Sequence, residues 1–343
     1  MDVTTVGLDV AKQVFQVHGV DAHGKVVVRK QLRRKEVVAY FTKLPACEIG
    51  MEAGSSSHYW ARRLQGLGHT VKLMAPQFVR PYVKTNKNDA RDAEAICEAV
   101  IRPSMRFVPI KTAEQQAILA LHRARQGFVK ARTAQANQLR SLLAEFGIVV
   151  PQGIHVLLRA VPAIVSDDEN GLLASVRTLF TRLLGHVKEL DRQVSELEQQ
   201  ILQWHKSNDQ SRKLEKVPGI GPITASALVA TIGDAKAFQH GRQLAAWLGL
   251  VPRQHSSGGK TRLHGISKRG DVYLRTLLIH GARSVLRVAA RHTDPTTTWL
   301  ARVRTRRNAN IAAVALANKH ARVVWALLAH DRDYTPAYAV TSS

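Results

Sequence analysis

Four acidic residues lie in sequence contexts that suggest a shared function. Asp9 lies inside an apolar stretch, VGLDVA, and Glu52 ends another, EIGME; both stretches have the pattern of β-strands. Asp89 and Asp92 lie three residues apart at the start of a predicted helix, so they share one of its faces. An acid within an apolar strand is costly unless it is paired or binds a cation. We therefore interpret these four residues as one set that holds a divalent cation.

The elements around the four acids predict how they converge. Residues 1–75 predict three antiparallel strands, a short helix near 36–44, a fourth strand, a second helix and a fifth strand, with these strand sequences in order: VGLDVA, FQVHGV, KVVVRKQL, CEIGME and TVKLM. This is the order of a ribonuclease-H-like α/β domain. In that fold the first and fourth strands are neighbours and a later helix crosses their ends. The four carboxylates would then meet there.

Clustered carboxylates repel one another, and a divalent cation relieves that repulsion. Mg²⁺ prefers oxygen ligands in octahedral geometry. Two such ions about 4 Å apart activate a nucleophile and stabilise a leaving oxygen in phosphoryl transfer. Lys84, Lys87 and Arg91 would hold phosphates beside the metal. The alternative is a set of separate surface acids and helix caps, because helix N-termini favour acids in any protein.

The net charge of +24 is distributed in two blocks. Residues 1–150 carry a net +11, residues 151–215 a net −1, and residues 216–343 a net +14. Because neutralising phosphates releases counterions, the natural partner of such blocks is nucleic acid. A membrane-surface protein would need a basic amphipathic helix with a Trp/Leu face near one end, and none stands out.

Other sequence features predict a reduced, cytosolic protein. No apolar run approaches the roughly 18 residues of a membrane helix, and the N-terminus has no secretion pattern. The two cysteines, Cys47 and Cys97, form neither a disulfide framework nor a metal motif.

Two long helical segments follow. Residues 113–146 form a helical stretch. Its polar face either is solvated or follows a nucleic-acid backbone. The second interpretation assigns nucleic-acid contacts to Arg123, Arg125, Lys130 and Arg132. From Val176 to Trp204 the apolar positions alternate in steps of four and three, which predicts a coiled coil. Its seam could pack against residues 113–146 of the same chain or against a second chain. We favour dimerisation, because the near-zero net charge of the connector removes self-repulsion.

The basic C-terminal block contains a second set of motifs. The stretch VPGIGPITASAL predicts a helix-hairpin-helix in which Gly219 and Gly221 let backbone amides approach a phosphate; a plain helical turn is the alternative. Downstream, SKRGDVYLR predicts a basic helix whose nucleic-acid contacts would be Lys268, Arg269 and Arg275. Another basic cluster, RVRTRR, spans residues 302–307.

Between these motifs lies a polar, flexible stretch, Ser256-Ser257-Gly258-Gly259, flanked by Arg253, Lys260 and Arg262. A serine in a glycine turn surrounded by cations could attack a phosphodiester, with His255 or a metal-bound oxygen accepting the proton. From the pattern alone, a phosphate-binding loop is favoured over a nucleophile.

Six motifs run in one order over roughly residues 5–325: GLDVAK, EIGMEAG, KNDARDAEAI, VPGIGPITASAL, AAWLGLVPRQHSSGG and GISKRGDVYLR. In these motifs the chain resembles transposases of the insertion-sequence 110 type with a DEDD catalytic domain, nearer their 1111 subgroup. The resemblance implies a RuvC-like Mg²⁺ site at Asp9, Glu52, Asp89 and Asp92. It also implies a serine nucleophile that becomes joined to DNA. Ser257 matches that position, although the adjacent Ser256 leaves the assignment ambiguous by one residue.

The same resemblance implies partners. A structured guide RNA encoded by the element (a bridge RNA) would pair with donor and target DNA, and the protein would act as a homo-oligomer, dimer or tetramer, through its coiled coil.

The expected fold is therefore α/β plus all-α. A RuvC-like DEDD catalytic domain would span residues 1–110, a long helix and coiled-coil connector 111–215, and a helical transposase domain with the helix-hairpin-helix and serine loop 216–330. The expected protein is a recombinase that excises and inserts a mobile element, in the bacterial cytoplasm at the nucleoid. No P-loop is present, in keeping with strand exchange without ATP. One rival is a RuvC-like metal-dependent junction nuclease that uses water. The other is a nucleic-acid-binding module with a lapsed active site.

Overall fold

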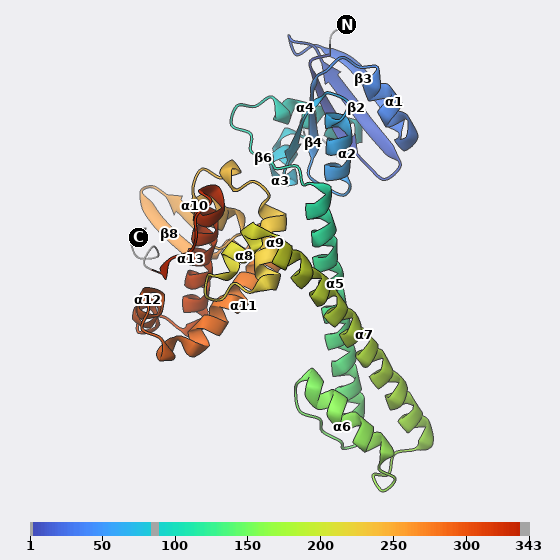
Figure 1. Ribbon diagram of the computed structural model, residues 1–343. Helices are drawn as coiled ribbons and strands as arrows, with labels where there is room; N and C mark the ends of the chain where they lie inside the picture. The colour runs from blue at the N-terminus through green and yellow to red at the C-terminus, as the bar shows by residue number, and fades with distance from the viewer. Residues whose placement is uncertain (1–2, 84–88, 337–343) are drawn as a thin grey trace. The chain divides into compact units, whose positions relative to one another are not determined.

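The computed structural model describes residues 3–83 and 89–336, with only the backbone of residues 89 and 90. The chain forms two compact units (Figure 1). The N-terminal unit comprises Met1–Gln116 with Ile232–Asp234, and the C-terminal unit comprises Ala117–Thr231 with Ala235–Ser343.

A six-stranded sheet in the order β3-β2-β1-β4-β5-β6 is the centre of the N-terminal unit. Its strands are β1 (Thr5–Val10), β2 (Val14–Val20), β3 (Val26–Arg33), β4 (Glu48–Glu52), β5 (Thr70–Met74) and β6 (Phe107–Val108). β1, β2 and β3 are antiparallel, while β4 and β5 run parallel to β1. The predicted order of strands is confirmed, and so is the adjacency of the first and fourth. The short antiparallel edge strand β6 was not predicted.

Helices cover both faces of this sheet. They are α1 (Val37–Thr42), α2 (Ser57–Gln65), α3 (Pro76–Val79) and α4 (Asp89–Val100), with 3₁₀ turns η1 (Arg34–Glu36) and η2 (Arg80–Tyr82). Because side chains alternate along a strand, Leu8 and Met51 share one face, where they join Phe41 and Trp60 of α1 and α2 in a buried core. The opposite face meets α4, which contacts β1, β2 and β4.

Two glycines let α4 lie very close to the sheet. Gly7 of β1 and Gly50 of β4 are directly paired in the parallel register. A Cβ on Gly7 would lie 2.1 Å from the Ala93 carbonyl oxygen, and a Cβ on Gly50 would lie 2.7 Å from the Val100 Cβ. Any side chain at either position would therefore push the helix away from the strands.

Replacing Gly7 with Ala should move α4 and impair function. We expect a loss of about 1–3 kcal/mol in the free energy of unfolding, as for overpacked cores. If the α4 carboxylates act together with those of β1 and β4, a displacement of about 1 Å should also reduce the activity of that site about 100-fold. Urea unfolding and an assay of that activity measure the two effects. Gly54→Ala is the matched control, since a Cβ there meets nothing within 4 Å. Full activity in Gly7→Ala would contradict the need for close packing of α4 against the sheet.

Two long helices pair within the C-terminal unit (Figure 1). They are α5 (Ala113–Ala144), which belongs to this unit from Ala117 on, and α7 (Ala174–Ser207), joined through α6 (Ile154–Ser166). Phe180 and Val187 of the α7 seam are buried in one core with Leu139 and Leu143 of α5.

Ion pairs link the two helices as well, Arg125 to Glu198 and Arg132 to Asp191. The apolar seam is thus used within the chain. This corrects our preference for dimerisation through it, because those side chains are already covered and a second chain would need another surface.

Shorter elements complete the C-terminal unit. They are α8 (Asp209–Glu215), α9 (Pro222–Ile232), η3 (Ala235–Ala237), α10 (Gly241–Trp247), β7 (Pro252–Ser257), β8 (Lys260–Ile266), α11 (Val272–Val288), η4 (Ala289–Arg291), α12 (Pro295–Arg304) and α13 (Ala309–Ala329). Within the described residues, α13 alone is long and apolar enough to cross a membrane. It packs against α10, α11 and α12, as the core helix of a globular unit does.

A buried histidine ties three helices of the C-terminal unit together. His122 of α5 is 1% exposed, with Nδ1 3.0 Å from the Tyr273 hydroxyl of α11 and Nε2 3.1 Å from Ser226 Oγ of α9. Since Ser226 donates its own proton to the Pro222 carbonyl, it accepts from Nε2–H, and Nδ1 accepts from Tyr273. The ring is neutral in this arrangement. Burial, with a smaller contribution from Arg125, lowers the pKa of His122 to about 4.

Acid should therefore destabilise the C-terminal unit through His122. The unfolded ring binds a proton below its ordinary pKa of 6.5, whereas the folded ring stays neutral down to about 4. Stability is full above the unfolded pKa and falls as the pH drops from 6.5 toward 4, by up to about 3 kcal/mol. Urea unfolding of wild type and His122→Gln at several pH values checks this. The variant should show the weaker pH dependence; parallel pH curves would contradict it.

Candidate functional site

Two of the predicted acids lie at the same level of adjacent strands. The parallel pairing of β1 with β4 matches Leu8 to Met51, so the next residues, Asp9 and Glu52, continue that register. Since Leu8 and Met51 face the α1/α2 core, alternation directs Asp9 and Glu52 to the α4 face. Both are half-buried. The structure thus brings these two carboxylates to one end of the sheet.

The direction of α4 brings its first turn to the same end. Gly7 faces Ala93 and Cys97, while Cys97 Sγ donates to the carbonyl of Thr5, two residues earlier on β1. α4 therefore runs in the opposite direction to β1, so the N-terminal end of α4 lies near Asp9. Asp89 begins the helix, and the half-buried Asp92 lies in its first turn.

The neighbours of Asp9 on β2 are polar. Gln16 is its register partner, and the Gln16 side chain donates to Gln31 Oε1 at 3.2 Å. His18, the partner of Gly7, is 5% exposed, and burial lowers its pKa against the opposing effect of Glu94. The α4 face therefore combines carboxylates with a buried imidazole.

This donor set suits a hard divalent cation by its chemistry, since every member offers carboxylate oxygens. Gly7 and Gly50 also favour a cation site, because they let α4 pack close to β1 and β4 near Asp9 and Glu52. Among the described side chains, no three His, Cys, Asp or Glu groups lie close enough to hold a metal ion. The Asp89 side chain falls outside that description.

The serine stretch is a β-hairpin, not the flexible loop that its composition predicts. β7 and β8 pair antiparallel, with Ser257 opposite Lys260 and Ser256 opposite Thr261. Gly258 and Gly259 form the two-residue turn with φ of 55° and 77°. Positive φ at both central residues is what a type I′ hairpin turn requires, so this Gly-Gly pair has a conformational role.

The hairpin register separates the two serines. Ser256 lies on the face of Gln254, which donates to Ser256 Oγ at 2.8 Å, and of Thr261 and Leu263. The opposite face carries Ser257 with four basic or imidazole side chains: His255, Lys260, Arg262 and His264. The His255 and His264 rings contact each other edge to face at 5.1 Å. Only Ser257 therefore shares its face with the cations.

The base of the hairpin is fixed to α10 and α11. A Cβ on Gly249 would lie 2.1 Å from the Arg269 carbonyl oxygen, and one on Gly270 would lie 1.9 Å from that of Trp247. Ser267 donates its backbone N–H to Val251, and Lys268 donates to Gly249 with φ of 55°.

Arg275 corrects a sequence-based interpretation. It is 7% exposed, and its Nη1 lies 2.9 Å from both the Leu248 and Arg269 carbonyl oxygens. A guanidinium used in this way holds the loop at the base of the hairpin and offers no surface to nucleic acid. The basic-helix pattern missed this because sequence does not reveal which arginine faces inward.

The other predicted cations divide into three groups. Arg125 and Arg132 form the α5–α7 ion pairs, which gives them a structural role. The exposed ones, which stay candidates for phosphate contact, are Arg91, Arg123, Lys130, Arg253, Lys260, Arg262, Lys268 and Arg269. Lys84 and Lys87 lie outside the described residues.

The two glycines of the predicted helix-hairpin-helix differ. Gly219 has φ of 87° and packs against α11, where a Cβ would lie 2.7 Å from the Gly281 carbonyl oxygen. Gly221 is exposed, and a Cβ there would meet nothing within 4 Å. Gly219 is thus explained by packing, and Gly221 alone leaves room for a phosphate.

The sequence analysis did not predict the close packing of α4 on Gly7 and Gly50. A glycine two residues before each strand acid, in VGLD and IGME, was the available signal, because glycine inside a strand marks close backbone approach. It also did not predict a cavity around Trp299 and Lys319 in the C-terminal unit. The only sequence signal for this cavity was a tryptophan before the basic cluster 302–307.

Comparison with known proteins gives consistent similarities. Residues 6–148 match the DEDD_Tnp_IS110 family model, described as Transposase, and residues 211–296 match that of the Transposase IS116/IS110/IS902 family. A probable family 20 transposase of Pseudomonas aeruginosa is 53% identical over 98% of this chain and 100% of its own length. The transposase for insertion sequence element IS1111A of Coxiella burnetii is 42% identical, over 97% and 92%. That for IS1328 of Yersinia enterocolitica is 42% identical, over 94% and 96%.

Proposed function

Because this chain belongs to the IS116/IS110/IS902 family and is a DNA transposase, we propose that it exchanges strands through serine attack on phosphodiesters assisted by a divalent cation. The observation that carries the proposal is the hairpin register. It puts Ser257 on the face with Lys260 and Arg262, while Ser256 lies on the other face.

The serine step follows from groups on that face. Ser257 Oγ attacks phosphorus and forms a phosphoserine ester, the bond from phosphorus to one strand oxygen breaks, and that oxygen leaves with a proton. His255, two residues earlier on the same face, is a candidate to accept the Oγ proton. Lys260 and Arg262 stabilise the charge that develops on the phosphate oxygens. The ester keeps the energy of the phosphodiester, so a second strand can displace the serine without ATP.

The four acids are proposed as the metal-binding set, with Mg²⁺ as the expected ion. Asp9 and Glu52 at the sheet end, with Asp92 in the first turn of α4, support this assignment. A cation bound there would neutralise the carboxylates and polarise phosphate oxygens. Asp89 completes the set by its place at the start of α4.

The partners proposed for this protein are DNA at the element ends and target, a structured guide RNA from the element, and further copies of the chain. The basic blocks of residues 1–150 and 216–343 have the charge to hold both nucleic acids. Since the α7 seam is covered by α5, we assign oligomer formation to another surface. The bacterial cytoplasm, where DNA and RNA are both present, is the proposed location.

A strand-exchange assay tests the proposal. Purified protein is incubated with Mg²⁺, DNA spanning the element junction and RNA transcribed from the non-coding end of the element. Joined recombinant strands formed without ATP are expected, and omission of either RNA or Mg²⁺ should abolish them. Free DNA ends without joined products would instead indicate the rival function, a junction nuclease that uses water.

A further inference from the structure

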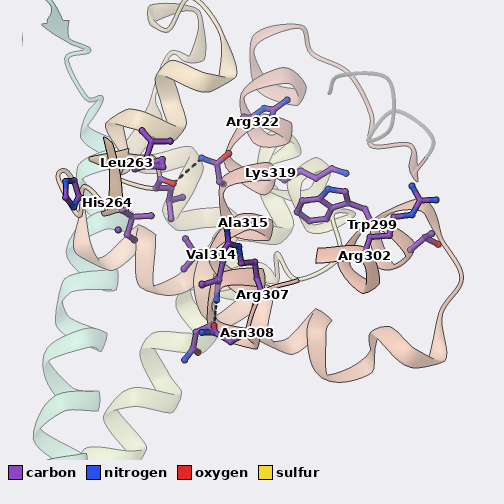
Figure 2. Close-up of a pocket in the computed structure, with 18 of the residues that line it drawn as sticks. Leu263, His264, Trp299, Arg302, Arg307, Asn308, Val314, Ala315, Lys319 and Arg322 are labelled. Atoms are coloured by element: carbon purple, nitrogen blue, oxygen red, sulfur yellow. Dashed lines mark hydrogen bonds between the residues drawn. The ribbon is translucent and has the colours of Figure 1, made fainter. Parts of the chain in front are cut away.

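A large cavity opens in the C-terminal unit between α12, α13 and the hairpin (Figure 2). Its volume is about 1320 Å³, above the range of roughly 300–1,000 Å³ typical of small-molecule pockets. Leu263 and His264 of β8, Trp299 of α12, and Asn318 and Lys319 of α13 are among its lining residues. The size suits a chain segment better than a small metabolite.

The lining is strongly cationic. Arg302, Arg307, Lys319 and Arg322 all contribute, and no Asp or Glu occurs among the residues that line it. Burial, together with the neighbouring Arg322, lowers the pKa of Lys319 against the opposing effect of Asp294. A polyanion entering the cavity would relieve the repulsion among these cations, so the charge of the walls selects phosphates.

The cavity also has surfaces for bases. Lys319 Nζ lies 4.9 Å from the centre of the Trp299 ring, which holds the ammonium at the wall (Figure 2). Leu263 and Ile311 are 64% and 47% exposed at the cavity, an unusual position for apolar side chains. Aromatic and apolar walls beside arginines are the combination that binds single strands, because unpaired bases present their faces and duplex bases do not.

The hairpin links this cavity to the proposed nucleophile. His264 lines the cavity and lies on the same face of the hairpin as Ser257, four residues along β8 from Lys260, the register partner of Ser257, a distance of about 13 Å in an extended strand. We propose that the cavity binds an unpaired segment of the DNA strand that Ser257 attacks, with phosphates on the arginines and a base against Trp299. The choice of DNA and of the attacked strand rests on the proposed function.

Fluorescence anisotropy with the full-length protein tests this. The probe is a labelled 12-nucleotide single-stranded DNA from the element end, compared with the same sequence as duplex and as RNA. Arg302→Ala/Arg307→Ala should weaken single-strand binding about 10- to 30-fold and reduce the slope of log affinity against log salt by about 1.4. Trp299→Ala should weaken it about 10-fold, and Trp299→Phe should restore most of that loss.

Arg304→Ala/Arg306→Ala is the matched control, since both arginines are exposed in the same basic cluster but do not line the cavity. It should change affinity less than about threefold. Ser257→Ala should bind like wild type, which separates strand binding from strand attack. Equal losses in the two arginine pairs would overturn the proposal, as would tighter binding of duplex or RNA than of single-stranded DNA.

Discussion

Replacing Glu52 with Gln, or Asp9 with Asn, should reduce transposition at least about 1,000-fold, equivalent to about 4 kcal/mol of transition-state stabilisation. Each change removes a negative charge and keeps the shape of the side chain. Because both residues are half-buried at the end of their strands, the sheet should remain folded. Transposition frequency in cells, with circular dichroism and urea unfolding of the purified variants, measures both effects.

The matched control is Glu48→Gln. Glu48 lies at the opposite end of β4 from Glu52 and pairs with Lys72 of β5. A partly exposed pair of this kind contributes at most about 1 kcal/mol, and transposition should stay within about threefold of wild type. Equal losses in Glu48→Gln and Glu52→Gln would indicate that charge on β4 matters only for folding or general binding.

Replacing Ser257 with Ala should abolish transposition, by on the order of 10⁴-fold or more, because the proposed covalent ester forms on its Oγ. Ser256→Ala should stay within about threefold of wild type, since Ser256 lies on the opposite face with Gln254. Both serines are exposed, so neither change should alter stability measurably. Transposition frequencies of the two variants, measured side by side, decide between the serines. A larger loss in Ser256→Ala would contradict the assignment from the register.

Sequence patterns predicted the N-terminal sheet well because its signals are local. Alternating apolar residues mark each strand, and the order of the elements then determines the adjacency of β1 and β4. The position of Asp9 beside Glu52 depends on the register between β1 and β4, which no local pattern contains. The close packing of α4 on Gly7 and Gly50 depends on the same register.

In the C-terminal half, sequence reasoning failed where the same composition serves two purposes. Arg275 and Lys268 belong to one basic motif, yet the first is buried on backbone carbonyls and the second is exposed. The α7 heptads predicted an apolar seam with two possible partners, and the structure shows the partner that we did not favour, α5 of the same chain. The Gly-Gly turn suggested flexibility, whereas its positive φ angles build a hairpin.

The most direct test of serine attack is to trap the covalent intermediate. Wild-type protein is incubated with Mg²⁺, guide RNA and end-labelled junction DNA, then denatured, and the protein–DNA adduct is digested and mapped by mass spectrometry. The account predicts an adduct whose nucleotide is attached at Ser257, present in Ser256→Ala and absent in Ser257→Ala and Asp9→Asn. Cleaved DNA with no adduct in any sample would contradict it and favour attack by water, leaving the hairpin as a phosphate-binding element.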